Sequence, residues 1–224
     1  MKRTALTFLT ATALLVACND NSGSTTAGAN KDSGNKEAMA DQTMAKKDAP
    51  PPAMPDTAAM NKAWQANMTP GPMHAWMAKW NGTWEGEVST WDSPTAPPNK
   101  AKATNVQSSM HNGLHTMGNF SSTMMGMPFE GHSTMGYDNI KKVFVSTWAD
   151  NVSSGMIMMT GTYDEASKTL NLKGKQTDMM TGKDSDIREE FKTIDDNTYN
   201  MTMYGTGPDG KEMKFMEGTF KRKK

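Results

Sequence analysis

Residues 120–138 read FSSTMMGMPFEGHSTMGYD, and this stretch decides the fold. Apolar side chains recur at even spacing on both sides of Gly126-Met127-Pro128, a pattern typical of two strands joined by a short turn. Successive side chains of a strand point to opposite faces, so residues an even number apart share a face. We therefore predict two paired strands around a Gly-Met-Pro turn, with Phe120, Met124, Phe129 and Met135 facing inward.

The same pattern runs in both directions from this hairpin, from Gly82 to the end of the chain. Turn sequences such as Asn112-Gly113, Asp138-Asn139 and Pro208-Asp209-Gly210 separate short runs of strand composition. There are about ten such runs: 83–90, 101–110, 114–125, 129–137, 142–149, 154–163, 168–177, 184–193, 198–205 and 211–222. Short links favour antiparallel neighbours, and so many strands do not stay an open sheet easily. The sequence predicts an all-β fold, a roughly ten-stranded antiparallel up-and-down barrel over residues 82–224.

A short helical lead-in is expected before the barrel, over residues 57–81. Asp56 or Thr57 can cap a helix in which Met60, Trp64 and Met68 recur on one face. The run from Thr69 to Pro72 ends this helix, and a second helical turn is expected at 73–79.

The N-terminus has the features of an export signal. Lys2 and Arg3 precede an apolar stretch that is too short to span a bilayer. Leu15-Val16-Ala17-Cys18 then resembles the bacterial lipobox, in which the cysteine becomes a lipid-bearing N-terminus. We predict a lipoprotein signal peptide at 1–17, lipidation at Cys18, and a lipid-anchored place in a bacterial cell envelope, at the outer membrane or facing the periplasm. A plain secretory signal with a chance cysteine is the alternative.

Residues 18–56 have a different composition, rich in Ser, Thr, Gly, Ala, Asn and Lys and ending in a proline-rich run. Because the segment has few apolar residues, their burial cannot offset the conformational entropy that the segment would lose on folding. We therefore expect a flexible tether there. The formal net charge of the chain is zero, and no basic stripe gives it an electrostatic reason to bind nucleic acid.

Methionine replaces leucine as the apolar filler of this chain. There are 23 methionines, and the flexible thioether side chain suits both cores and adaptable cavity walls. A barrel of more than eight strands has room for a ligand. We predict a cavity that binds a small apolar ligand, lined by Trp84, Phe120, Met124, Phe129, Met135, Met201 and Met203. A solid structural or interaction barrel, and a copper or oxidant handler, are the alternatives.

Motifs for catalysis are weak. Gly205 to Gly210 contains three glycines at dinucleotide-like spacing, but a turn and a strand follow where that chemistry needs a helix. Ser133 lacks the second glycine of a nucleophile elbow. His111 and His115 flank a turn and make at best half of a metal site. We predict no catalytic residue, no metal site, no cofactor and no enzymatic activity.

The chain resembles a known family in a series of short motifs. Gly82-Thr83-Trp84 resembles the start of lipocalin-like, or calycin, barrels. Further motifs, in chain order, resemble a bacterial family catalogued as domain of unknown function 1579: Thr69-Pro70-Gly71 with His74, Trp84-Glu85-Gly86, Gly126 to Gly131, Gly136 to Asn139, Val145 to Trp148, Gly161 to Asp164, Met180 to Lys183 and Met203 to Lys211. The resemblance covers about residues 57–224. It implies a calycin-like β-barrel and implies no activity.

Overall fold

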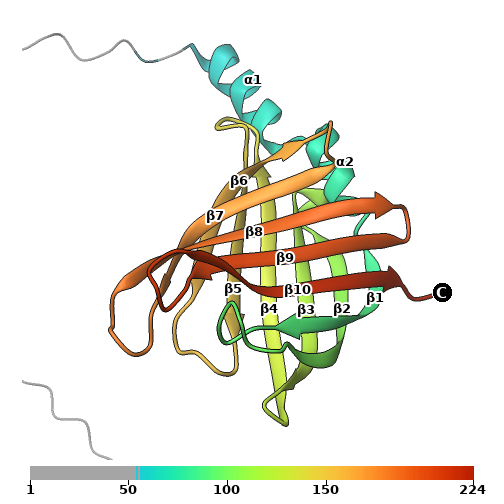
Figure 1. The fold of residues 1–224 in the computed structure, drawn as a ribbon. Coiled ribbons are helices and arrows are strands. Elements are labelled where there is room, and N and C mark those ends of the chain that lie inside the picture. The colour runs from blue at the N-terminus through green and yellow to red at the C-terminus, as the bar shows by residue number, and fades with distance from the viewer. Residues whose placement is uncertain (1–53, 55) are drawn as a thin grey trace, which may run out of the picture. The chain divides into compact units, whose positions relative to one another are not determined.

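The computed structural model describes Met54 and residues 56–224, which form a closed barrel of ten antiparallel strands (Figure 1). The strands are β1 (Gly82–Thr90), β2 (Asn99–Met110), β3 (His115–Met124), β4 (Met127–Asp138), β5 (Val143–Asp150), β6 (Ile157–Asp164), β7 (Thr169–Thr177), β8 (Asp184–Asp195), β9 (Thr198–Thr206) and β10 (Glu212–Arg222). Each strand pairs with its neighbour in sequence, and β1 closes the barrel by pairing with β10. The prediction of an all-β, ten-stranded up-and-down barrel is confirmed.

Two short helices precede the barrel, α1 (Thr57–Met68) and α2 (Pro72–Ala78), with a 3-10 turn, η1 (His111–Gly113), between β2 and β3. Asp56 caps α1, because its carboxylate accepts a hydrogen bond of 2.6 Å from the backbone N–H of Ala58. Within the described part of the chain, neither helix has the length and apolar character needed to cross a membrane. The expected signal peptide, Cys18 and nearly all of the expected tether lie outside the described residues.

The opening hairpin differs in one detail from its prediction. The turn is formed by Met125 and Gly126, whose φ angles of 51° and 79° are both positive, and Pro128 already belongs to β4. Met124 pairs with Met127 across this two-residue connection. A two-residue hairpin turn with the twist of the strands needs positive φ at both positions. Glycine meets this need at the second position, which places the turn one or two residues earlier than predicted.

One end of the barrel is closed by α2 and the residues that follow it. The ring of Trp76 lies 5.4 Å from that of Phe144 and 4.6 Å from that of Tyr163. The ring of Trp80 contacts those of Tyr199 and Trp84. These partners lie where β1, β5 and β9 begin and where β6 ends. Because the strands alternate in direction, all of these points belong to the same end of the barrel.

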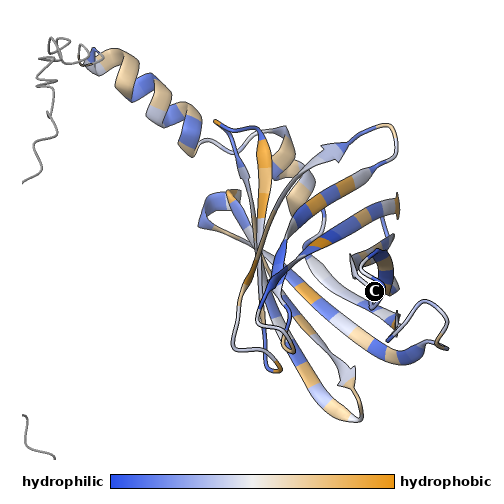
Figure 2. Ribbon diagram, turned by 60° about the vertical axis from the view of Figure 1, so that its left-hand side comes forward, coloured by the Kyte–Doolittle hydropathy of each residue, from blue (hydrophilic) through white to orange (hydrophobic). Residues whose placement is uncertain are grey.

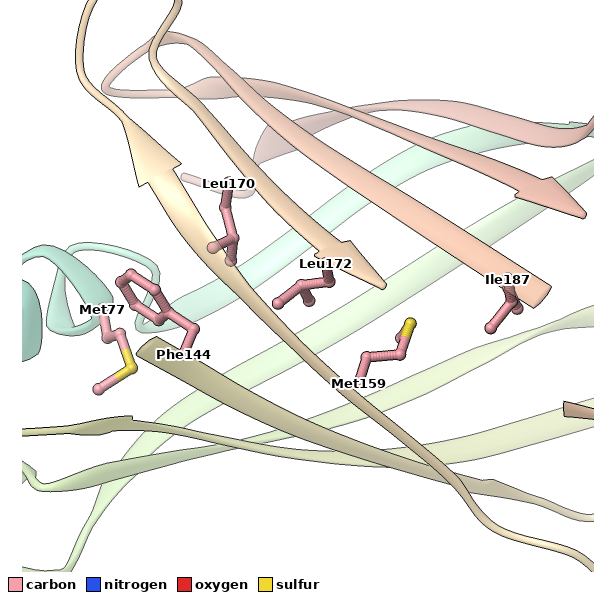
Figure 3. Packing of buried hydrophobic residues seen from close by; sticks show 6 residues of the cluster. All are labelled: Met77, Phe144, Met159, Leu170, Leu172 and Ile187. Atoms are coloured by element: carbon pink, nitrogen blue, oxygen red, sulfur yellow. The ribbon is translucent and has the colours of Figure 1, made fainter. Parts of the chain in front are cut away.

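The buried core extends from this closed end along the inside of the barrel. One cluster of buried residues contains Met77, Phe144, Met159, Leu170, Leu172 and Ile187, which reach inward from α2, β5, β6, β7 and β8 (Figure 3). A second cluster contains Trp84, Val88, Ala103, Tyr199, Met201 and Phe220. Hydrophobic and hydrophilic residues alternate along several strands (Figure 2), as expected of a sheet with one face inside.

Candidate functional site: a methionine-lined cavity

Trp76 of α2 and Trp80 after it form an aromatic plug at the closed end, and beyond this plug the barrel encloses a cavity of about 1020 Å³. Side chains of α2 and of β2 to β10 contribute to its wall. Its open end lies among the turns opposite α2, where Met125, Val152 to Met156, and Asp178 with Met179 line the mouth. The interior is therefore not filled by side chains, which a solid barrel would require.

An aromatic group forms the wall near β3, β4 and β5. The ring of Phe120 lies 6.0 Å from the rings of both Phe129 and Trp148. Gly131 makes this arrangement possible, because a Cβ atom there would collide with the indole of Trp148. The indole N–H donates a hydrogen bond of 2.8 Å to the carboxylate of Asp150, which orients the ring at the mouth.

Six of the seven predicted ligand-binding residues line this cavity: Phe120, Met124, Phe129, Met135, Met201 and Met203. The seventh, Trp84, faces inward but does not belong to the cavity wall. It is buried between Trp80 and Tyr199, under the guanidinium of Arg222, which lies 4.2 Å from its ring centre. The plug formed after α2 covers Trp84, and strand alternation alone could not reveal that cover.

A bulge in β10 adds two residues to the wall. The pairing of β10 with β9 shifts between Lys214 and Met216, so that Met216 pairs with Met203 and Phe215 is left without a partner. Phe215 and Met216 consequently both line the cavity, although they are adjacent in sequence.

A carboxyl group that belongs to no recognised sequence motif lies in the cavity wall. Glu189 of β8 lies between Leu172 of β7 and Met203 of β9 in the strand pairing. It is 8% exposed, and it makes no hydrogen bond or ion pair with any described residue. Burial in the cavity wall disfavours the charged form and raises the pKa of Glu189 to about 8. The signal was present in the sequence, because Glu189 shares the face of β8 with Ile187 and Phe191.

Other polar groups of the cavity are uncharged or lie at the mouth. Asn105 of the lining donates a 3.3 Å hydrogen bond from its side-chain amide to the hydroxyl of Tyr199, which lies in the core behind the wall, and burial raises the pKa of Tyr199 well above its ordinary value. Small polar side chains occur mainly on the β2 to β5 wall: Asn105, Gln107, Thr116, Ser133 and Ser146. The charged residues of the lining are Asp150, Asp178 and Glu189, all of them acidic.

The histidines lie away from the cavity lining. His111 and His115 face each other at the turn between β2 and β3, with 3.2 Å between their Nδ1 atoms. His132 contacts the side chain of Asn119, and His74 is buried, where its Nδ1 accepts a hydrogen bond from the backbone of Gly71. Within residues 56–224, no group of three or more His, Cys, Asp or Glu side chains is arranged to hold a metal ion.

Comparison with known proteins identifies a family and a fold. Residues 69–222 match the family described as protein of unknown function, DUF1579. The crystal structure of Rv2717c from M. tuberculosis is similar, with a TM-score of 0.53 and 13% sequence identity, over 70% of this chain and 100% of that one. At this identity the likeness shows the fold alone. No curated protein matches the chain.

Proposed function

Because the chain belongs to the DUF1579 family, whose description carries no activity, we propose a function from the cavity itself. The protein is a non-catalytic binding protein that holds a small apolar or amphipathic molecule inside its barrel. The observation that carries this proposal is the cavity of about 1020 Å³, with a methionine and aromatic wall and an open mouth. Known small-molecule sites are concave, mostly apolar and of similar volume.

The composition of the wall supports a ligand that is recognised by shape rather than by many polar contacts. Methionines of β3, β4, β6, β9 and β10 line the interior. Their unbranched side chains can repack around guests of different outline. The Gly82-Thr83-Trp84 start of β1 further supports a place among lipocalin-like barrels.

The sequence before the barrel supports an envelope location. The lipobox-like Leu15-Val16-Ala17-Cys18 would place lipid chains on Cys18, and several such chains make a stable membrane anchor. Labelled palmitate fed to cells that express the chain should enter the wild-type protein and not the Cys18→Ser variant. Equal labelling of the two proteins would refute lipid anchoring through Cys18.

Native mass spectrometry tests the binding function. The chain from residue 18 onward, with Cys18→Ser so that no lipid is attached, is purified without detergent and measured under native and denaturing conditions. We expect an additional mass that disappears on denaturation, and displacement of the uncharged dye N-phenyl-1-naphthylamine by apolar compounds. A clean protein mass together with no dye binding would refute the proposal in favour of a structural barrel.

A second candidate is favoured by the methionines outside the barrel wall. Met125, Met179 and Met180 are about nine-tenths exposed at the turns, where oxidants and soft metal ions can reach them. An oxidant or copper handler would show sulfoxide at these residues after mild peroxide treatment, or Cu(I) retained after gel filtration. The neighbours Met158 and Met159 do not form a chelating pair, since Met158 is exposed and Met159 is buried.

A further inference from the structure

Among the described residues, Glu189 is the one charged group in the depth of a mainly apolar cavity, and its carboxyl has no hydrogen-bond or ion-pair partner there. Its neighbours in the strand pairing, Leu172 and Met203, can neither donate a hydrogen bond nor supply a positive charge. Arg188 precedes it in the chain but lies on the other face of β8. There it contacts the ring of Tyr204 and forms ion pairs with glutamates. A buried carboxyl without a partner lowers the stability of the folded protein. A ligand that pairs with this carboxyl therefore forms an interaction that the empty protein cannot make.

The charges of the whole cavity indicate which partner that is. All three charged residues that the described chain contributes to the lining are acidic, two at the mouth and Glu189 inside, and that part of the chain places no lysine, arginine or histidine there. A carboxylate or phosphate group in the cavity would meet negative charge with nothing to neutralise it. A cation would meet attraction at the mouth and a counter-charge in the depth.

Aromatic rings stand next to this carboxyl. Phe191 lies two residues from Glu189 on the same face of β8, and its ring is 5.9 Å from that of Trp80 and 6.4 Å from that of Tyr199. Aromatic faces attract cations, and most strongly where water is excluded.

We propose that the barrel takes a lipophilic cation, an apolar molecule with one protonated amine, whose amine pairs with Glu189 while its apolar part lies against the methionine and aromatic wall. This inference rests on the proposed binding function and names the ligand class of the same cavity.

Binding of such a cation depends on pH in a definite direction. Burial holds Glu189 neutral below its pKa of about 8, so at neutral pH an ammonium ligand must displace a proton from it. Tyr199 is the other titratable group coupled to Glu189, and it stays neutral because burial raises its pKa. From β7 and β9, Leu172 and Met203 contribute no charge, and the remaining lining acids are Asp150 and Asp178. The affinity for the amine should therefore rise from pH 6 to pH 9, while that for an alcohol of equal length stays level.

Displacement of N-phenyl-1-naphthylamine tests the proposal with three probes that differ only in the head group: dodecylamine, dodecanol and dodecanoate. The protein is the chain from residue 18 with Cys18→Ser. Three forms are compared, namely this protein, its Glu189→Gln variant and its Glu190→Gln variant. Glu190→Gln is the control, because it makes the same substitution at the next residue, whose side chain points outward and pairs with Arg188.

We expect dodecylamine to bind best and dodecanoate worst. At pH 9, where Glu189 is ionised, Glu189→Gln should weaken dodecylamine by about 10- to 100-fold, the worth of a charged hydrogen bond, and should leave dodecanol unchanged. Glu190→Gln should leave all three probes unchanged. Equal amine affinity in the Glu189→Gln variant, or dodecanoate binding as tightly as dodecylamine, would overturn the cation assignment while the binding function stands. Absence of binding by the dye and all three probes would overturn both.

Discussion

Replacing Glu189 by glutamine should make the protein more stable at alkaline pH and leave it unchanged at acidic pH. Glutamine keeps the shape and the polarity of the protonated carboxyl but cannot ionise. In the unfolded chain Glu189 titrates near 4.5, and burial in the barrel raises its pKa to about 8. The folded state therefore holds a proton between these two values that the unfolded state has lost.

The sign and size of the effect follow from this difference. Where the folded state binds more protons, the free energy of unfolding falls as the pH rises. The decrease begins near pH 4.5, where the unfolded chain starts to ionise, and ends above pH 8, where the folded protein ionises too. Relative to Glu189→Gln, the wild type should lose about 2 kcal/mol between pH 6 and pH 8. The full difference above pH 9 is about 5 kcal/mol, at about 1.4 kcal/mol per pH unit.

Urea unfolding followed by tryptophan fluorescence at pH 5, 6, 7, 8 and 9 measures this difference. The comparison between the two proteins isolates Glu189, because every other titrating group is common to both. Glu190→Gln, on the outer face of β8, serves as the matched control and should follow the wild type across the range. Parallel curves for the wild type and Glu189→Gln from pH 6 to pH 8 would mean that Glu189 is ionised and hydrated in the folded protein. Burial in the cavity wall would then not raise the pKa of Glu189.

Three further predictions concern strand packing, a buried histidine and the cavity volume. Gly161→Ala should lower the free energy of unfolding by about 1–3 kcal/mol, because its Cβ would collide with the backbone of the adjacent strand. Gly155→Ala is its control in urea unfolding, because the added Cβ would have only a side-chain oxygen nearby, at 3.6 Å. An equal loss of stability in the two variants would contradict the proposed collision at Gly161. Acidification from pH 7 to pH 5 should destabilise the protein partly through His74, whose pKa is lowered by burial and by a neighbouring histidine. In this range the unfolded chain binds a proton at His74 that the folded protein does not bind, which favours unfolding. His74→Gln should flatten this part of the pH profile, and an unchanged slope would exclude His74 as its source. Met203→Trp adds side-chain volume inside the cavity and should weaken N-phenyl-1-naphthylamine binding at least about tenfold. Met158→Trp, on the outer surface, is the control and should leave dye binding unchanged. Equal effects of the two substitutions would show that the dye binds outside the barrel.

The local pattern was sufficient to predict the strands and helices. Alternation and turn residues are short-range properties, so the boundaries of all ten strands lie within a few residues of the predicted ones. The cap at Asp56 is equally local. The turn after Met124 was misplaced because glycine was expected at its start rather than at its second position.

Part of the candidate site could also be predicted, because the direction of a side chain follows from its parity in a strand. Phe120, Met135 and Met203 were assigned to the interior in this way, and they line the cavity. Parity also placed Trp84 inside, correctly, but it could not show that the segment after α2 would cover it. Whether another segment packs over an inward-facing side chain depends on the folded barrel, and the alternation within one strand does not show it.

By itself, the sequence determined that the chain is an all-β barrel with a soft, methionine-rich inner face, because alternation and turn chemistry act between near neighbours. Only the tertiary structure decided that the inside is a cavity closed at one end by Trp76 and Trp80. It also decided that Glu189 sits in that cavity with a raised pKa. The volume left empty and the loss of water around a carboxyl depend on all the strands at once, and only the closed barrel brings them together.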